Sequence, residues 1–277
     1  SEIKAEETIR EVKKLCGSPR LSKSSAWFKY ENCFGSGFLC DCAYGGNRYR
    51  CVYTKKYIDR DEAYFYKISG YPKGKIYVFG YEPIIWRVLK IEGGKALLLS
   101  EKAIDGQNFY RSEDRRIIDG KPVYPNNYEH SDIRQWLNGT FLNSAFIDDE
   151  KSRLFLTTVK NGAETTKRQP NEHACADTED KVFLLSFREA EAWFTDNKAR
   201  WKKATEYAKA TGCYAYGTHD AKFSNCCWWL RSPDHKYYNM VRCVGDGGGL
   251  GDGGFSVSNE PVLSPEGIVP AIFVNLD

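Results

Sequence analysis

Two short apolar segments near the C-terminus place the strongest constraint on how this chain can fold. Residues 226–230 read CCWWL and residues 267–274 read GIVPAIFV, and the stretch between them is rich in Tyr, Asp and Gly. Short apolar runs bounded by turn-forming residues are typical of buried strands. We therefore expect two rigid strands that hold a surface segment at residues 234–259, in which many side chains are tolerated. A segment of this kind favours binding over catalysis, because a catalytic centre needs a few fixed groups.

The order of the other elements indicates an α+β fold. Residues 4–16 have apolar side chains at helical spacing. Strands are predicted at residues 49–53, 63–68, 75–79, 83–91, 95–99, 157–160 and 181–185. Helices are predicted at residues 132–137, 140–146, 148–155, 187–194 and 198–211. Strands at both ends with helices between them favour an α+β fold over alternating β and α units.

Local turn and capping signals set several boundaries. Ser131 and Ser186 are predicted helix N-caps, and Ser186 is followed three residues later by Glu189, as in a capping box. The Glu92-Gly93-Gly94 sequence predicts a hairpin turn. Asn138-Gly139 is expected to end the helix that Ser131 begins.

The length and net charge of the chain argue against two classes of partner, nucleic acids and membranes. The chain has 277 residues and a formal net charge of +3. We expect no nucleic-acid partner, because such partners select a dense basic face. We also expect no membrane insertion, because no apolar run reaches the roughly 20 residues of a transmembrane helix. The N-terminal residues SEIKAEE do not form a signal peptide, which favours a cytoplasmic protein, with a mature secreted or surface-displayed form as the alternative.

The ten cysteines leave their chemical state open. Cys33, Cys40, Cys42 and Cys51 are separated by six, one and eight residues, whereas zinc sites usually pair ligands two to four residues apart. We therefore expect these four cysteines to form disulfides or to be free thiols rather than to bind a metal ion. Without a signal sequence, we expect reduced thiols, several of them buried as small hydrophobic groups.

No familiar catalytic or cofactor motif is present. The sequence has no GxSxG nucleophile elbow, no Walker loop and no HExxH zinc motif. The glycines at 245–251 lack the helix that follows a dinucleotide-binding loop. Asp246 and Asp252 are similar to one copy of a calcium-binding glycine repeat, but two carboxylates fall short of the roughly 6–8 oxygens that calcium takes. We therefore predict no cofactor, no metal and no enzymatic activity, with calcium as the alternative.

Five motifs occur in a fixed order along the chain. They are GYEPIIWRVL at 80–89, ALLLS at 96–100, SDIRQWLN at 131–138, DKVFLLS at 180–186 and WWLRSP at 228–233. Together with GIVPAI at 267–272, where Val269 replaces the Arg of a G-V-R-P-A-L ending, they resemble a family of bacterial domains of unassigned function that is common in gut Firmicutes. The resemblance implies a domain at residues 75–277. Residues 1–74 are then an N-terminal helix and a Cys-containing extension packed on that domain.

Some members of this family resemble the variable proteins of diversity-generating retroelements. Those proteins are often C-type-lectin-like, of the formylglycine-generating-enzyme subtype, so the resemblance implies this fold at 75–277. Mutation of adenines in Asn codons yields a limited set of residue types, and between 234 and 259 only Lys236 and Met240 fall outside it. The resemblance to the enzyme subtype is confined to the fold, because no matching catalytic Cys pair is found.

The 234–259 segment is predicted to bind a protein or a glycan. Tyr gives a large contact area with little loss of side-chain entropy, and Gly, Ser and Asn give adaptable hydrogen bonds. The predicted ligand-binding residues are Asp234, His235, Tyr237, Tyr238, Asn239, Arg242, Asp246, Asp252, Phe255 and Asn259. Two alternatives stay open. One is a formylglycine-generating-type or other thiol-dependent enzyme that uses Cys226, Cys227 or Cys243, and the other is a structural or host-interaction module.

Overall fold

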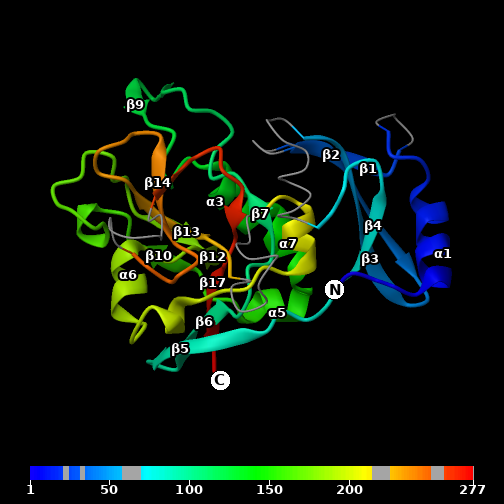
Figure 1. Ribbon diagram of the computed structural model, residues 1–277. Helices are drawn as coiled ribbons and strands as arrows, with labels where there is room; N and C mark the ends of the chain where they lie inside the picture. The colour runs from blue at the N-terminus through cyan, green and yellow to red at the C-terminus, as the bar shows by residue number, and fades with distance from the viewer. Residues whose placement is uncertain (21–24, 32–34, 58–69, 214–224, 251–258, 277) are drawn as a thin grey trace.

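The structure is a computed structural model of the chain. It describes all residues except 21–24, 32–34, 58–69, 214–224, 251–258 and 277 (Figure 1). The described residues form a mixed α+β protein of small, mostly antiparallel sheets and short helices, which confirms the predicted fold class at this level. Among these residues no helix is long and apolar enough to cross a membrane. The strand predicted at 63–68 lies outside the described residues.

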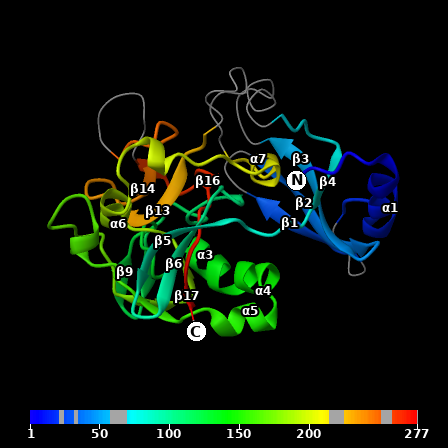
Figure 2. The ribbon, with the colours of Figure 1, turned by 90° about the horizontal axis from the view of Figure 1, so that it is seen from below.

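The N-terminal part is a four-stranded antiparallel sheet covered by one helix. Its elements are α1 (Glu6–Cys16), β1 (Trp27–Glu31), β2 (Gly35–Tyr44), β3 (Asn47–Tyr57) and β4 (Ile76–Gly80), with the strands in sequential order. Helix α1 lies on the side of the sheet that faces away from the rest of the protein (Figures 1 and 2). Val12 and Cys16 on its inner face pack against Trp27, Cys40 and Cys51 of the strands. The helix predicted at 4–16 is confirmed.

A second sheet has the strand order β12-β17-β6-β5. It contains β5 (Trp86–Glu92), β6 (Lys95–Ser100), β12 (Val182–Phe183) and β17 (Ala271–Asn275). Gly93 and Gly94 form the predicted hairpin turn between β5 and β6 with φ of 57° and 72°, values that favour glycine. The C-terminal strand β17 pairs with β6 over its whole length, so the end of the chain is part of the core of this sheet.

A third sheet carries the predicted site. Its order is β15-β14-β13-β16-β7, from β7 (Gly106–Gln107), β13 (Trp228–Pro233), β14 (Met240–Val244), β15 (Asn259–Pro261) and β16 (Glu266–Gly267). Trp228 and Trp229 are both fully buried, although neighbouring strand residues face opposite sides. Each indole N–H donates to a backbone carbonyl, that of Arg200 and that of Gln107. Both faces of β13 are therefore covered, and both tryptophans belong to the scaffold.

Short helices and two-stranded ribbons fill the middle of the chain. They are β8 (Arg116–Ile118), β9 (Lys121–Val123), α3 (Asp132–Trp136), the π-helix η1 (Leu137–Phe141), α4 (Leu142–Ala145), α5 (Asp148–Arg153), β10 (Thr157–Val159), η2 (Ala163–Thr165), β11 (Thr178–Asp180), α6 (Phe187–Ala192), η3 (Lys198–Arg200) and α7 (Glu206–Ala210). Ser131 caps α3 and Ser186 caps α6 in a capping box with Glu189, as predicted.

Two predicted helix boundaries are wrong. The helix that Ser131 begins does not end at Asn138-Gly139 but continues through η1 into α4. The predicted helix at 198–211 is broken between η3 and α7, because buried Lys202 donates to the Ser100 carbonyl at 2.7 Å and Ala204 makes a bridge to Ala103. Those tertiary contacts hold residues 201–205 in an extended path.

Asn138, which lies within η1, links this π-helix to the start of β12. Its side-chain carbonyl accepts hydrogen bonds from the backbone N–H groups of Lys181 and Val182, and its amide donates to the carbonyl of Val182 at 2.8 Å. One side chain therefore satisfies the backbone at the start of β12.

The Asn138→Ala substitution is expected to lower the free energy of unfolding by about 2–3 kcal/mol, because it leaves buried backbone groups without partners. Urea unfolding followed by tryptophan fluorescence measures this change. The matched control is Asn47→Ala, which removes one exposed bond of 3.3 Å and is expected to change stability by less than about 0.5 kcal/mol. Equal effects of the two substitutions would contradict the role of Asn138.

Candidate functional site

The loop between β13 and β14 presents two adjacent tyrosines. Tyr237 and Tyr238 are 43% and 37% exposed. The Asp234 carboxylate accepts the backbone N–H groups of Lys236 and Tyr237 at 2.8 and 3.0 Å, and the Met240 N–H donates to the Tyr237 carbonyl. These bonds fix a tight turn, so the tyrosines stand on an ordered backbone.

A buried ion pair lies beneath this turn. The Arg242 guanidinium is 2.6 Å from the Asp234 carboxylate, and both residues are only 2% exposed. The Asn259 amide donates to the same carboxylate at 3.3 Å. A paired, buried carboxylate is held in one geometry because its hydrogen bonds are stronger at low dielectric. Asp234, Arg242 and Asn259 thus support the loop from below, whereas Tyr237 and Tyr238 face solvent.

Segments distant in sequence hold the same loop. The buried Asn126 amide donates to the carbonyls of Tyr237 and Met240, each at 3.1 Å. The His173 ring nitrogen Nδ1 lies 2.7 Å from the Asp234 carbonyl. Neither contact is predicted by a local sequence pattern.

The exposed tyrosines continue into a wider aromatic surface. The Tyr124 and Tyr238 ring centroids are 6.2 Å apart, and the exposed Arg115 guanidinium lies 5.1 and 4.8 Å from these two centroids. We name Tyr124, Arg115, Tyr237 and Tyr238 the tyrosine platform. Tyr124 and Arg115 come from the chain around β8 and β9, where the sequence predicted neither strands nor binding residues.

The other predicted site residues lie in different places. His235 is partly buried beside Asp234, and the Asn239 amide donates to Glu113 at the margin of the platform. Asp246 follows β14, whereas Tyr238 precedes it, so a strand of about 16 Å separates them. Its carboxylate accepts the N–H of Gly247. Asp252 and Phe255 lie outside the described residues.

The glycine turn after β14 is packed against the scaffold. Gly248 has a φ of 76°, and a Cβ built on it would lie 1.9 Å from the Asn197 carbonyl oxygen. Its own carbonyl accepts the Arg200 Nε–H at 2.8 Å. The part of the glycine-rich stretch that the structure describes is therefore a closely packed turn. No group of three or more His, Cys, Asp and Glu side chains among the described residues is placed to hold a metal ion.

The thiols of the alternative enzyme site are buried. Cys226, Cys227 and Cys243 are 1%, 4% and 0% exposed. A hydrogen bond with Cys243, and then burial, raises the pKa of Cys227 well above its usual value. The same contact lowers the pKa of Cys243, but burial prevails and raises it. A nucleophilic thiol needs access and a lowered pKa.

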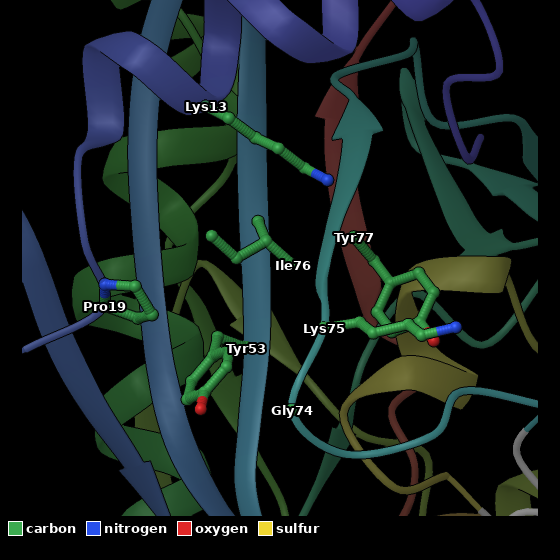
Figure 3. A pocket seen from close by; sticks show the side chains of 7 residues that line it. All are labelled: Lys13, Pro19, Tyr53, Gly74, Lys75, Ile76 and Tyr77. Atoms are coloured by element: carbon green, nitrogen blue, oxygen red, sulfur yellow. The ribbon is translucent and has the colours of Figure 1, made fainter.

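Two of the hollows on the described part of the protein lie away from the loop between β13 and β14. One, of about 560 Å³, lies between β3 and β4 on one side and helices α3 and α4 on the other, with Arg48, Tyr81, Trp86 and Phe146 in its lining. Ligand pockets are commonly of this size. The other, of about 610 Å³, lies between α1 and β4, where Lys13 reaches from the helix toward the strand (Figure 3). Neither hollow includes a residue of the tyrosine platform.

These features define an α+β protein of small, mainly antiparallel sheets that presents an aromatic loop surface. A family model described as a domain of unknown function (DUF6273) matches residues 93–276, more than half of the chain. The chain therefore belongs to this family, which confirms the predicted relation to a domain family of unassigned function. No curated protein and no solved structure matches it. The N-terminal sheet with α1 lies outside the matched residues.

Proposed function

We propose that this is a non-catalytic binding protein that recognises a protein or a glycan through the tyrosine platform. The observation that carries the proposal is the exposure of Tyr237 and Tyr238, 43% and 37%, on a loop whose backbone is fixed from below. Aromatic side chains that are ordered before binding lose little entropy when a ligand docks. The Arg115 guanidinium, which lies over the rings of Tyr124 and Tyr238, adds several N–H donors to this surface.

The proposal divides the predicted residues by role. Tyr237, Tyr238 and Asn239 contact the ligand, whereas Asp234 and Arg242, at 2% exposure each, position the loop. Tyr124 and Arg115 join the contacting group, because they form ring and cation–π contacts with Tyr238.

Two finer points belong to the same proposal. We propose a C-type-lectin-like fold of the formylglycine-generating-enzyme subtype for residues 75–277, and diversification of 234–259 by a retroelement. The residue types between 234 and 259 support the second point. Comparing the gene across isolates tests it: variation confined to 234–259, beside a reverse-transcriptase gene and an imperfect template repeat, is the expected result. Uniform variation along the gene would refute diversification and leave the binding surface to be tested separately.

The Tyr237→Ser, Tyr238→Ser double variant is expected to lose at least tenfold in affinity, because central aromatic residues each contribute about 2 kcal/mol to an interface. A glycan array first supplies the probe, and calorimetry with the best-bound glycan measures the loss. If the array gives no signal, a display library of peptides supplies the probe instead.

The matched control for this experiment is Phe28→Ser. Phe28 is 42% exposed on β1, in the N-terminal sheet, so its loss should leave affinity unchanged. Unchanged affinity in the tyrosine double variant would show that the platform is not the binding surface.

The buried thiols favour a binding protein over the thiol-dependent alternative. A thiol enzyme requires a cysteine that reacts rapidly in the folded protein. Titration with a thiol reagent under native conditions separates the two, since a rapidly reacting Cys226, Cys227 or Cys243 would support the enzyme.

A further inference from the structure

Most of the described cysteines lie against another cysteine. The Cys16 thiol donates to the Cys51 sulfur at 3.6 Å, and the thiols of Cys40 and Cys42 also interact with Cys16. In the family domain, thiol hydrogen bonds join Cys213 to Cys226 and Cys227 to Cys243. All nine described cysteines are free thiols in this structure, and eight of them take part in these contacts.

The Cys16–Cys51 contact joins two elements of the N-terminal part. Cys16 is the last residue of α1, and Cys51 lies within β3 directly opposite Cys40 of β2. Cys16 is 6% exposed and Cys51 is 0% exposed. The Trp27 indole N–H donates to the Cys16 carbonyl at 2.7 Å, which fixes the end of the helix over the sheet.

We propose that Cys16 and Cys51 form a disulfide that fastens α1 to the sheet when the chain folds in the presence of a small disulfide oxidant. Their sulfurs are already in van der Waals contact, so side-chain rotation of both residues can bring them to the bonded distance of about 2.05 Å. Ala or Val could fill the space at positions 16 and 51 if packing were the only requirement. A cross-link, in contrast, requires two thiols that lie close together, as they do where the end of α1 meets β3. A metal is not favoured, because the described side chains do not form a ligand set.

The reaction is thiol–disulfide exchange with a compound of the oxidised-glutathione class. The thiolate of one cysteine attacks a sulfur of the small disulfide, whose S–S bond breaks and releases one small thiol. The second cysteine thiolate then attacks the protein sulfur of the mixed disulfide and releases the second small thiol. Two cysteine thiols are oxidised, one small disulfide is reduced, and both protons pass to the small thiols.

The environment of Cys16 sets when this reaction takes place. The hydrogen bond with Cys51, and then burial, raises the pKa of Cys16 far above its usual value. Little thiolate is therefore present in the folded protein, and exchange is slow there. The cross-link forms while the chain folds and is then shielded from reduction. Disulfides of this kind persist in oxidising compartments, which favours the secreted or surface-displayed form of the protein.

Refolding the full chain in a glutathione redox buffer tests the proposal. Peptide mapping of the wild-type protein without reductant is expected to recover the Cys16 peptide joined to the Cys51 peptide, lighter by two hydrogen atoms. Adding reductant during refolding is expected to lower the melting temperature by roughly 10 °C, because the cross-link closes a loop of about 35 residues. A map with Cys16 and Cys51 both free, either one joined to a different cysteine, or a metal ion held by four free thiols overturns the proposal.

The variants Cys16→Ser and Cys51→Ser should each abolish the cross-linked peptide, whereas Cys175→Ser should retain it. Should either serine variant fail to fold, the wild-type map decides alone. The proposal does not depend on the tyrosine platform: loss of ligand binding in the platform variants leaves the peptide map unchanged.

Discussion

The Arg242→Met variant is expected to lose about 3–5 kcal/mol of its free energy of unfolding, because the substitution leaves the Asp234 carboxylate buried without its charged partner. The two groups are 2.6 Å apart, and each residue is 2% exposed. The Asp234 carboxylate also holds the N–H groups of Lys236 and Tyr237, so the loop is expected to loosen together with the pair. Urea unfolding measures the stability, and hydrogen exchange of the 236–240 amides measures the loosening.

Two comparisons isolate the buried charge as the cause. The double variant Asp234→Leu, Arg242→Met is expected to recover a large part of the lost stability, since no unpaired charge remains. Arg111→Met removes an ion pair of the same length, 2.6 Å, in which the arginine is 73% exposed. That variant should lose less than about 1 kcal/mol. A loss this small for Arg242→Met as well would show that the pair does not hold the loop.

Local sequence signals predicted the elements whose causes are local. The capping box of Ser186 and Glu189 and the paired glycines 93 and 94 each depend on residues within four positions of one another. The same holds for α1. Its apolar spacing predicted a helix at 4–16, and the observed helix spans Glu6–Cys16. In these places the backbone conformation follows from the neighbouring residues.

The broken helix at 198–211 shows where local signals fail. Its apolar stripe is compatible with a helix, but the buried Lys202 reaches the Ser100 carbonyl, 102 positions away in sequence. A buried ammonium group without a partner would be very unfavourable, so this bond outweighs the helix propensity of a few residues. Trp201, a large apolar residue of this segment, is 39% exposed as a result.

The sequence predicted the exposed residues of the candidate site but not the buried residues that support them. Tyr237 and Tyr238 were identified by residue type, and the structure shows both on the surface. Burial of Asp234 and Arg242 was not predictable, because charged residues in a polar segment usually face solvent. Asn126, which holds the loop, is 111 positions from Tyr237, and no local pattern connects residues that far apart.

Glu266 gives a large expected effect of pH on stability. The residue lies on β16 and is 4% exposed, and its Oε2 atom has no hydrogen-bond partner among the described residues. Burial first, and then the nearby Glu260, raises the pKa of Glu266 from 4.5 to about 8. The folded protein therefore keeps the proton at a pH at which the unfolded chain has released it. Protonation of Glu266 therefore stabilises the folded state. This contribution is fully present below about pH 4.5 and is lost as the pH rises to about 8.

The Glu266→Gln variant removes this titration while keeping the shape of the side chain. At pH 8 it is expected to be more stable than the wild-type protein by roughly 3 kcal/mol, because folding no longer competes with ionisation of a buried carboxyl. At pH 4.5 the two proteins are expected to be similar in stability. Urea unfolding at pH 4.5, 6 and 8 measures both curves. The control is Glu179→Gln, on the exposed face of β11, which is expected to follow the wild-type curve at every pH. If the Glu266→Gln curve runs parallel to that of the wild type, the Glu266 carboxyl ionises normally in the folded protein.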